Sequence, residues 1–164
     1  MPETVTRRDK NNYYLDIAET VAERGTCLRR NYGALIVRDD VIISTGYAGA
    51  PRGRKNCVDI GECVREANAV PRGERYELCR SVHAEANAII AVDRPKMMGS
   101  TLYLVGVERS TGGYVEDAMP CAMCKRLIIN AGLEWVIIRQ SRDEFAAIPV
   151  SHWVDHDPTL EAGY

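Results

Sequence analysis

The sequence predicts an α/β fold of three layers (α/β/α), in which helices cover both faces of a central mixed sheet. First, short apolar runs of strand length alternate along the chain with segments whose apolar residues recur at helical spacing. Second, the length of 164 residues is typical of one compact domain. No internal repeat, low-complexity tract or linker divides the chain, so we expect a single domain over residues 1–164.

The first half of the chain predicts a helix, a hairpin and an irregular stretch. Apolar residues recur at helical spacing over residues 11–23, and Gly25 follows as a C-terminal cap residue. Two short apolar runs, 34–37 and 41–46, flank a turn-like spacer and predict a β-hairpin. Residues 47–70 are rich in Gly, Pro, Arg and Cys. Long irregular segments in compact domains usually carry function.

The second half of the chain predicts two helices and two strands. These are a helix over about 82–92, a strand over 101–105, a helix over 120–131 and a strand over 135–138. Ser81 can cap the first helix, Pro120 suits the first turn of the second, and Gly132 can end it. The periodicity of residues 141–164 is weak. We therefore expect a core over about 11–140 and a tail that packs along the surface or extends to a partner.

Charge and composition bear on the partners of the protein. The chain has 21 Lys and Arg against 23 Asp and Glu, a net charge of −2. Nucleic-acid binding usually needs a clear basic excess, so nucleic acid is not an expected partner, whereas a few local arginines suffice for a small phosphorylated ligand. The chain begins with a polar segment and has no run of about 18 apolar residues. We therefore expect a cytoplasmic protein that does not enter a membrane.

Two of the six cysteines form the clearest motif. Because cytoplasmic thiols are usually reduced, metal binding or catalysis explains them better than disulfides. Cys121 and Cys124 are separated by two residues, and His83 falls near a predicted helix start. One imidazole and two thiolates suit zinc, and a catalytic site keeps a fourth position for water. Two helix N-termini directed at one point would favour thiolates there.

Glu85 distinguishes a catalytic zinc site from a structural one. Water that attacks an aromatic ring carbon must pass its proton to the ring nitrogen and then to the leaving amine, and a carboxylate beside the metal can carry it. A C-x-x-C pair alone is more often structural or redox-active, but a redox pair is expected early in a thioredoxin-like pattern, and here it comes late. The combination of H-x-E with P-C-x-x-C is the signature of zinc deaminases.

With these motifs the chain resembles the deoxycytidylate (dCMP) deaminase family of the cytidine-deaminase-like superfamily. The similar stretch runs from about residue 27 to 139 and includes, besides the zinc motifs, the runs 44–53, 79–85 and 128–132. The resemblance implies the cytidine-deaminase-like fold and the conversion of dCMP to dUMP and ammonia. It also implies Zn2+ held by His83, Cys121 and Cys124, with Glu85 as the catalytic residue. A homo-oligomer is expected, and the loop that ends the run 44–53 could bind dCTP or dTTP as regulators.

The resemblance and the need for a cation suggest where a phosphate would bind. Arg29 and Arg52 match arginine positions of the family. The other candidates are suggested by proximity alone: Arg30, Arg54, Lys55 and Arg139.

The base and sugar have candidate contacts of their own. Tyr47 or Tyr103 could stack on the base, although strand tyrosines more often pack in the core. Ala84 and Pro120, beside the metal ligands, could offer backbone groups to the pyrimidine edge. Ala48 stands where the family usually has an Asn that helps to hold the sugar and phosphate. Either another group does that work, or the substrate differs from dCMP.

Four cysteines remain outside the catalytic motif: Cys27, Cys57, Cys63 and Cys79. Four is the number that a closed structural zinc site needs, and some members of the resembling family carry a second zinc in this region. The spacing is loose compared with a C-x-x-C pair, and buried free thiols are the alternative.

Three other functions are weighed against dCMP deamination. A deaminase of single-stranded DNA or RNA would need a basic, aromatic-lined channel, whereas this chain has one Phe, two Trp and a slightly acidic balance. A protein that only binds nucleotides would have no use for Glu85. A modified nucleotide or free base as substrate stays open because of Ala48.

Overall fold

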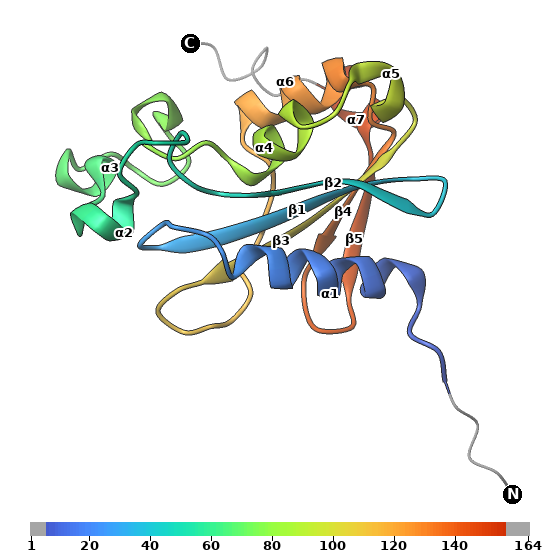
Figure 1. The fold of residues 1–164 in the computed structure, drawn as a ribbon, viewed down its shortest axis with the longest axis horizontal. Helices are drawn as coiled ribbons and strands as arrows, with labels where there is room; N and C mark the ends of the chain where they lie inside the picture. Colours follow the sequence, from blue (N-terminus) through green and yellow to red (C-terminus); the bar gives the residue numbers. More distant parts are fainter. Residues whose placement is uncertain (1–5, 157–164) are drawn as a thin grey trace, which may run out of the picture.

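The computed structural model describes residues 6–156, which form a five-stranded sheet between two helical layers. Figure 1 shows α1 (Lys10–Ala22) on one face of the sheet. The other face is covered by α4 (Ala84–Ile90), α5 (Arg94–Met97), α6 (Ala122–Ala131) and α7 (Val150–Asp155). The predicted three-layer α/β/α architecture is confirmed.

The sheet has the strand order β2-β1-β3-β4-β5. Its strands are β1 (Arg30–Arg38), β2 (Val41–Tyr47), β3 (Thr101–Glu108), β4 (Trp135–Arg139) and β5 (Phe145–Pro149). β1 and β2 form the predicted antiparallel hairpin, and β1 also pairs antiparallel with β3. β3 and β4 are parallel, with α6 in the connection between them, while β4 and β5 are antiparallel. The sheet is therefore mixed, as predicted.

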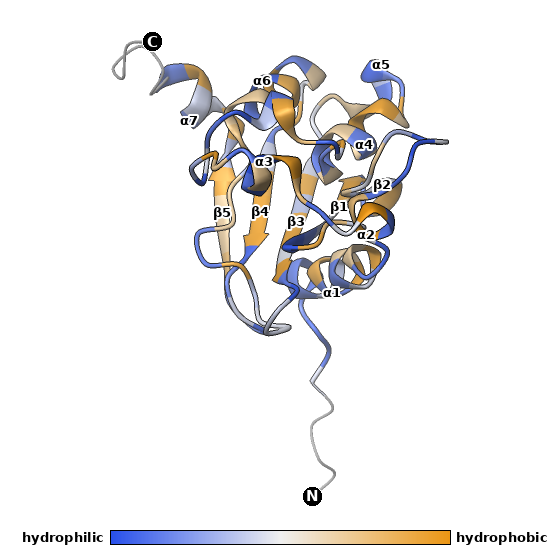
Figure 2. Cartoon of the chain, turned by 90° about the vertical axis from the view of Figure 1, so that its left-hand side faces the viewer, coloured by the Kyte–Doolittle hydropathy of each residue, from blue (hydrophilic) through white to orange (hydrophobic). Residues whose placement is uncertain are grey.

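The apolar runs of the central strands are continuous because both faces of the sheet are buried. Successive side chains of a strand point to opposite faces. On β1, Ala34 and Ile36 belong to the cluster beneath α4 and α6, whereas Leu35 and Val37 belong to the cluster beneath α1. β3 and β4 alternate in the same way, and Figure 2 shows their hydrophobic colouring between the helical layers.

The segment between β2 and α4 is more regular than predicted. Residues 47–70, expected to be irregular, contain two one-turn helices, α2 (Cys57–Ile60) and α3 (Val64–Ala67), and a 3-10 turn, η1 (Tyr76–Leu78), follows. Asn56 starts α2 with a reciprocal capping arrangement, in which its backbone N–H donates to Asp59 (2.9 Å). One turn of helix is too short to produce a detectable periodicity, so the sequence did not reveal these elements.

The tail prediction is wrong for the described residues after 140. β5 extends the sheet next to β4, and α7 places Val150 and Trp153 in the core cluster beneath α6. β5 lies at the edge of the sheet and is only partly buried, so it lacks the clear alternation that marks a strand. Residues 157–164 of the tail lie outside the described residues.

Membrane insertion has no candidate element in the described part of the chain. Among the helices of residues 6–156, none combines the length and the apolar character that a membrane span requires.

Candidate active site

Helix α4 begins directly after a short antiparallel backbone pairing between Val82 and Gly49, a residue that follows β2. Val82 and Gly49 exchange two backbone hydrogen bonds, of 2.7 and 3.1 Å. This pairing keeps the backbone extended until His83, which is the N-cap residue of α4. The prediction that the helix begins at residue 82 with Ser81 as its cap is therefore wrong by two residues.

Helix α6 supplies the two cysteines. Cys121 is its N-cap residue, Cys124 lies in its first turn, and Gly132 ends the helix in a left-handed conformation (φ 80°), as predicted. α4 and α6 pack side by side on the same face of the sheet. Two helix N-termini therefore meet at one point, and their partial positive charges favour thiolates there.

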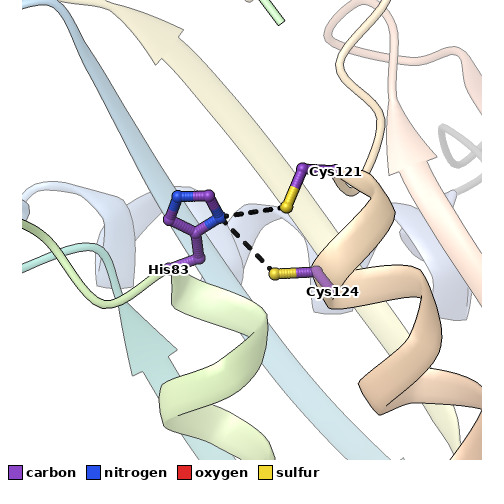
Figure 3. Close-up of side chains that lie close together, drawn as sticks. All are labelled: His83, Cys121 and Cys124. Carbon is purple, nitrogen blue, oxygen red and sulfur yellow. Dashed lines mark hydrogen bonds between the residues drawn. The ribbon is translucent and has the colours of Figure 1, made fainter. Parts of the chain in front are cut away.

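The three side chains converge as a metal site requires. His83 Nδ1 lies 3.5 Å from the Sγ atoms of both Cys121 and Cys124, and Figure 3 shows the two sulfurs facing one edge of the ring. All three ligand atoms lie within 4.8 Å of one another. Tetrahedral ligands at Zn–S of about 2.3 Å and Zn–N of about 2.0–2.1 Å would have their N and S atoms about 3.6 Å apart. The donor set and its spacing fit zinc.

The protonation of these three groups is coupled. Hydrogen bonds from Cys124 and His83 lower the pKa of the Cys121 thiol. The bond to Cys121, together with burial, raises the pKa of Cys124. Hydrogen bonds to Cys121 and Cys79 raise the pKa of His83 to about 10. A metal ion would replace the shared protons, because zinc ligands bind in their deprotonated forms.

Glu85 lies in the first turn of α4, two residues after His83, and is 5% exposed. Burial raises the pKa of its carboxyl group, and the neighbouring His83 opposes this shift. The residue lines a cavity of about 120 Å³ together with His83, Ala84 and Cys121. A carboxylate that can exchange protons thus shares one cavity wall with the metal ligands.

The cavity contains some of the predicted substrate contacts and not others. Arg29, Arg30, Ala48 and Ala84 line it. The predicted candidates outside its lining are Tyr47, Arg52, Arg54, Lys55 and Pro120.

Two candidates are engaged elsewhere. Arg139 is 1% exposed and donates to Asp16 and Glu19 on α1, both at 2.7 Å, on the opposite face of the sheet. Tyr103 packs beneath α1 and donates to Asn11 (2.8 Å). Arg139 as a phosphate ligand and Tyr103 as a stacking residue are therefore wrong predictions. Position in the sequence did not reveal that they lie on the α1 face.

The four remaining cysteines surround the same region without forming a second compact group. Cys27, Cys63 and Cys79 line the cavity. Cys57 lies outside its lining, and burial raises the pKa of its thiol, with a smaller contribution from the nearby Cys27 and Cys79. Within residues 6–156, only His83, Cys121 and Cys124 bring three ligand atoms within 4.8 Å of one another.

Six residues of the cavity wall were not predicted as site residues from the sequence: Tyr32, Arg65, Arg72, Tyr76, Ser81 and Met119. Four of them lie between β2 and α4, in a region where regular patterns are absent. The sequence does show several arginines between residues 65 and 80, but it does not show which of these side chains point into the cavity.

A pair of glycine substitutions tests how rigidly the sheet positions α4. A Cβ at Gly46 would overlap the backbone of α4 at Ala84 and Ala88 (2.5 Å to its N), and one at Gly33 would overlap α1 at Ala18 and Ala22 (2.6 Å to its N). Both Gly46→Ala and Gly33→Ala should lower the free energy of unfolding by about 1–3 kcal/mol through overpacking. Only Gly46→Ala should also weaken zinc binding, because α4 carries His83.

Urea unfolding and competition with a zinc chelator would measure the two effects. Equal zinc affinity in the two variants would show that the site tolerates displacement of α4.

Proteins that place a His, Cys, Cys set at two helix ends, with Glu two residues after His, form the class of zinc-dependent deaminases. This chain has that arrangement on an α/β/α fold. The family model described as "Cytidine and deoxycytidylate deaminase zinc-binding region" matches residues 8–140. The chain belongs to this family, whose members are hydrolases.

Individual relatives agree with that assignment. The chain is 36% identical over 138 residues to the deoxycytidylate deaminase of Mycobacterium phage D29, covering 81% of this chain and 96% of that protein. It is 30% identical to the deoxycytidylate deaminase of Schizosaccharomyces pombe, covering 80% of this chain but only 37% of the longer yeast protein.

Two solved structures share the fold. The dCMP deaminase of cyanophage S-TIM5 in complex with dCMP and dUMP superposes with a TM-score of 0.55 at 23% identity, covering 82% of this chain and 83% of that one. Cytidine deaminase from Burkholderia pseudomallei gives a TM-score of 0.55 at 15% identity, covering 88% and 95%.

Proposed function

We propose that this protein hydrolyses dCMP to dUMP and ammonia, with zinc held by His83, Cys121 and Cys124. The observation that carries the proposal is the buried carboxylate of Glu85 in the same cavity wall as the ligands His83 and Cys121. The relative from Mycobacterium phage D29, which matches over nearly its full length, is named a deoxycytidylate deaminase. That relationship favours dCMP over the other substrates of the family.

In the proposed reaction, zinc would supply the nucleophile and Glu85 transfers the protons. Bound zinc would lower the pKa of a water molecule and so supply the nucleophile. Glu85 takes the proton of the attacking water and gives it to N3 of the base. The second proton, from the former water oxygen now attached to C4, passes through Glu85 to the exocyclic nitrogen. The water oxygen forms a bond to C4, the C4–N bond breaks, and ammonia leaves.

The size and the lining of the cavity are compatible with a nucleotide as substrate. Ligand pockets usually measure about 300–1,000 Å³, so a cavity of about 120 Å³ encloses only part of a nucleotide. Its arginines could neutralise a phosphate, whereas a channel for single-stranded nucleic acid would combine a continuous basic groove with stacking aromatic side chains.

The proposal is tested by measuring the activity of purified protein of known zinc content on a set of substrates. Ammonia release would be followed with dCMP, CMP, dCTP, deoxycytidine, cytosine, 5-methyl-dCMP and several purine nucleotides. A clear preference for dCMP is the expected result. Turnover of another member with no reaction of dCMP would overturn the substrate assignment and retain the chemistry, while no turnover of any member would overturn both.

Three further properties are part of the proposal. Cys27, Cys63 and Cys79 line the cavity, and together with Cys57 they could hold a second, structural zinc if the chain rearranged, which metal analysis would detect. We also propose a homo-oligomer, as is expected for this family, and the exposed Ile90 on α4 and Leu127 on α6 are candidates for its interface. Ultracentrifugation measures the assembly, and activity with and without dCTP and dTTP measures regulation.

The substitution Ala48→Asn tests the departure from the family pattern. Ala48 is buried in the cavity wall, and its backbone N–H and carbonyl are already bonded to Tyr32 and Thr26. An Asn side chain would add a donor toward the sugar of the nucleotide. We expect kcat/KM to rise about 2- to 10-fold, the value of one hydrogen bond, for dCMP and deoxycytidine alike. Unchanged kinetics would mean that another group already makes this contact.

A further inference from the structure

Arg65 on α3 is a buried cation in the wall of the active-site cavity. Its side chain is 7% exposed and lines the same cavity as His83 and Glu85. Its guanidinium donates three hydrogen bonds to two backbone carbonyl oxygens. Nε and Nη2 donate to the carbonyl of Glu74 (3.2 and 2.8 Å), and Nη2 also donates to the carbonyl of Pro71 (3.1 Å). Nη1 makes no hydrogen bond to any residue in the described part of the chain.

Arg65 forms no ion pair within residues 6–156, because no carboxylate there lies within 4 Å of its guanidinium. Glu66 pairs with Arg29, and Glu77 pairs with Arg75 and interacts with Arg65 only at longer range. Arg139, which is also buried, differs from Arg65 because it has two carboxylate partners. Buried charges in proteins are normally paired, because carbonyl dipoles alone do not replace a counter-ion.

The position of Arg65 relative to the metal ligands is defined by Tyr76. The guanidinium carbon lies 4.2 Å from the centre of the Tyr76 ring, and Tyr76 packs edge-on against His83, with ring centres 5.2 Å apart. This stack holds the cation one aromatic ring away from the metal ligand. Arg65, Tyr76 and His83 all line the cavity, so the cation and the metal ligand share one wall.

The other cations of the cavity wall are less suited to be the principal anion ligand. Arg29 and Arg30 are paired with Glu66 and Glu108, both at 2.8 Å. Arg72 is exposed and donates to the carbonyl of Glu116 (3.3 Å). Arg65 alone among these four combines burial with the absence of a carboxylate partner in the described residues.

We propose that Arg65 binds the 5′-phosphate of the nucleotide substrate and is the residue that makes the enzyme select a nucleoside monophosphate over the nucleoside. This inference rests on the proposed function, since it concerns the same cavity. Phosphate would become the counter-ion of Arg65, with Nη1 donating charge-assisted hydrogen bonds to its oxygens.

The test compares substrates with and without a phosphate. Arg65→Gln should lower kcat/KM for dCMP about 10- to 100-fold more than kcat/KM for deoxycytidine, the value of a hydrogen bond to a charged group. Arg65→Lys keeps the charge and the stem but loses the planar fork, so we expect an intermediate loss. Arg24→Gln, an exposed arginine after α1, is the matched control and should leave both substrates unaffected.

An equal loss for both substrates would show that Arg65 only supports the loop of Pro71 and Glu74, and would overturn the inference. If Arg65→Gln does not fold, Arg65→Lys decides: a loss confined to dCMP supports the phosphate role, and no loss or an equal loss contradicts it.

A binding measurement separates this inference from the proposed function. Calorimetry would compare dUMP with deoxyuridine on the zinc-loaded protein. Tighter binding of dUMP that disappears in Arg65→Gln supports Arg65 as the phosphate ligand, even if dCMP is not the physiological substrate. If the wild type deaminates dCMP but binds dUMP no more tightly than deoxyuridine, the inference fails and the proposed function stands.

Discussion

Replacing Glu85 with Gln should reduce kcat for dCMP by about 10²–10⁴-fold, the usual contribution of a positioned general acid–base group. Gln has nearly the volume of Glu and keeps a polar group at this buried position, but it cannot accept and return a proton. The carboxylate is not among the three clustered ligands His83, Cys121 and Cys124. Zinc content and melting temperature should therefore remain those of the wild type.

Zinc analysis and thermal unfolding are the controls for this variant, and ammonia release is the readout. A variant that holds zinc and retains near wild-type turnover would show that another group moves the proton, and the mechanism above would then be wrong. Loss of zinc would instead indicate that Glu85 supports the ligands.

Replacing Cys124 with Ala should remove the catalytic zinc and with it all measurable deamination. Cys124 is 2% exposed and is one of the three clustered side chains that we propose as zinc ligands in residues 6–156. Two of these ligands would remain in the variant, for an ion that requires a nearly complete set. Because zinc binds the folded state, its loss should also lower the melting temperature. A chelator should destabilise the wild type and have little further effect on the variant.

A matched substitution of Cys57 turns the same experiment into a count of metal sites. Cys57 is similarly buried but lies outside the ligand cluster. With a single zinc site, Cys57→Ala retains the wild-type zinc content and Cys124→Ala has none. With a second zinc, each variant loses one ion of two. Full retention of zinc at the catalytic site in Cys124→Ala would refute the ligand assignment.

The metal site could be predicted because its information is local. Cys121 and Cys124 lie within one helical turn, and His83 and Glu85 within another. The helix that follows each motif ensures that its residues share one end, whatever the rest of the fold does. The two motifs then come together if their helices lie side by side on one face of the sheet, which agrees with the order of elements predicted from the apolar spacing.

The phosphate candidates show where this reasoning stops. Arg139 follows an apolar strand, and its sequence neighbours do not reveal which face of the sheet it occupies. In the structure it is neutralised by acids of α1, more than 100 residues away in the chain. Arg65 lies in a segment without periodicity, and its orientation depends on carbonyl groups of a loop and on the ring of Tyr76.

The amino-acid sequence by itself determined the α/β class and the His83, Cys121 and Cys124 cluster that we propose as the zinc site, with Glu85 beside it as the proposed catalytic carboxylate. These features depend on local spacing and on the chemistry of particular side chains. Only the tertiary structure decided that β5 and α7 complete the sheet and core, that Arg139 is a structural ion-pair residue, and that Arg65 faces the cavity without a counter-ion. The physical reason is the same in each case. Pairing, burial and neutralisation of charge are relations between residues distant in the chain, and no single segment contains them.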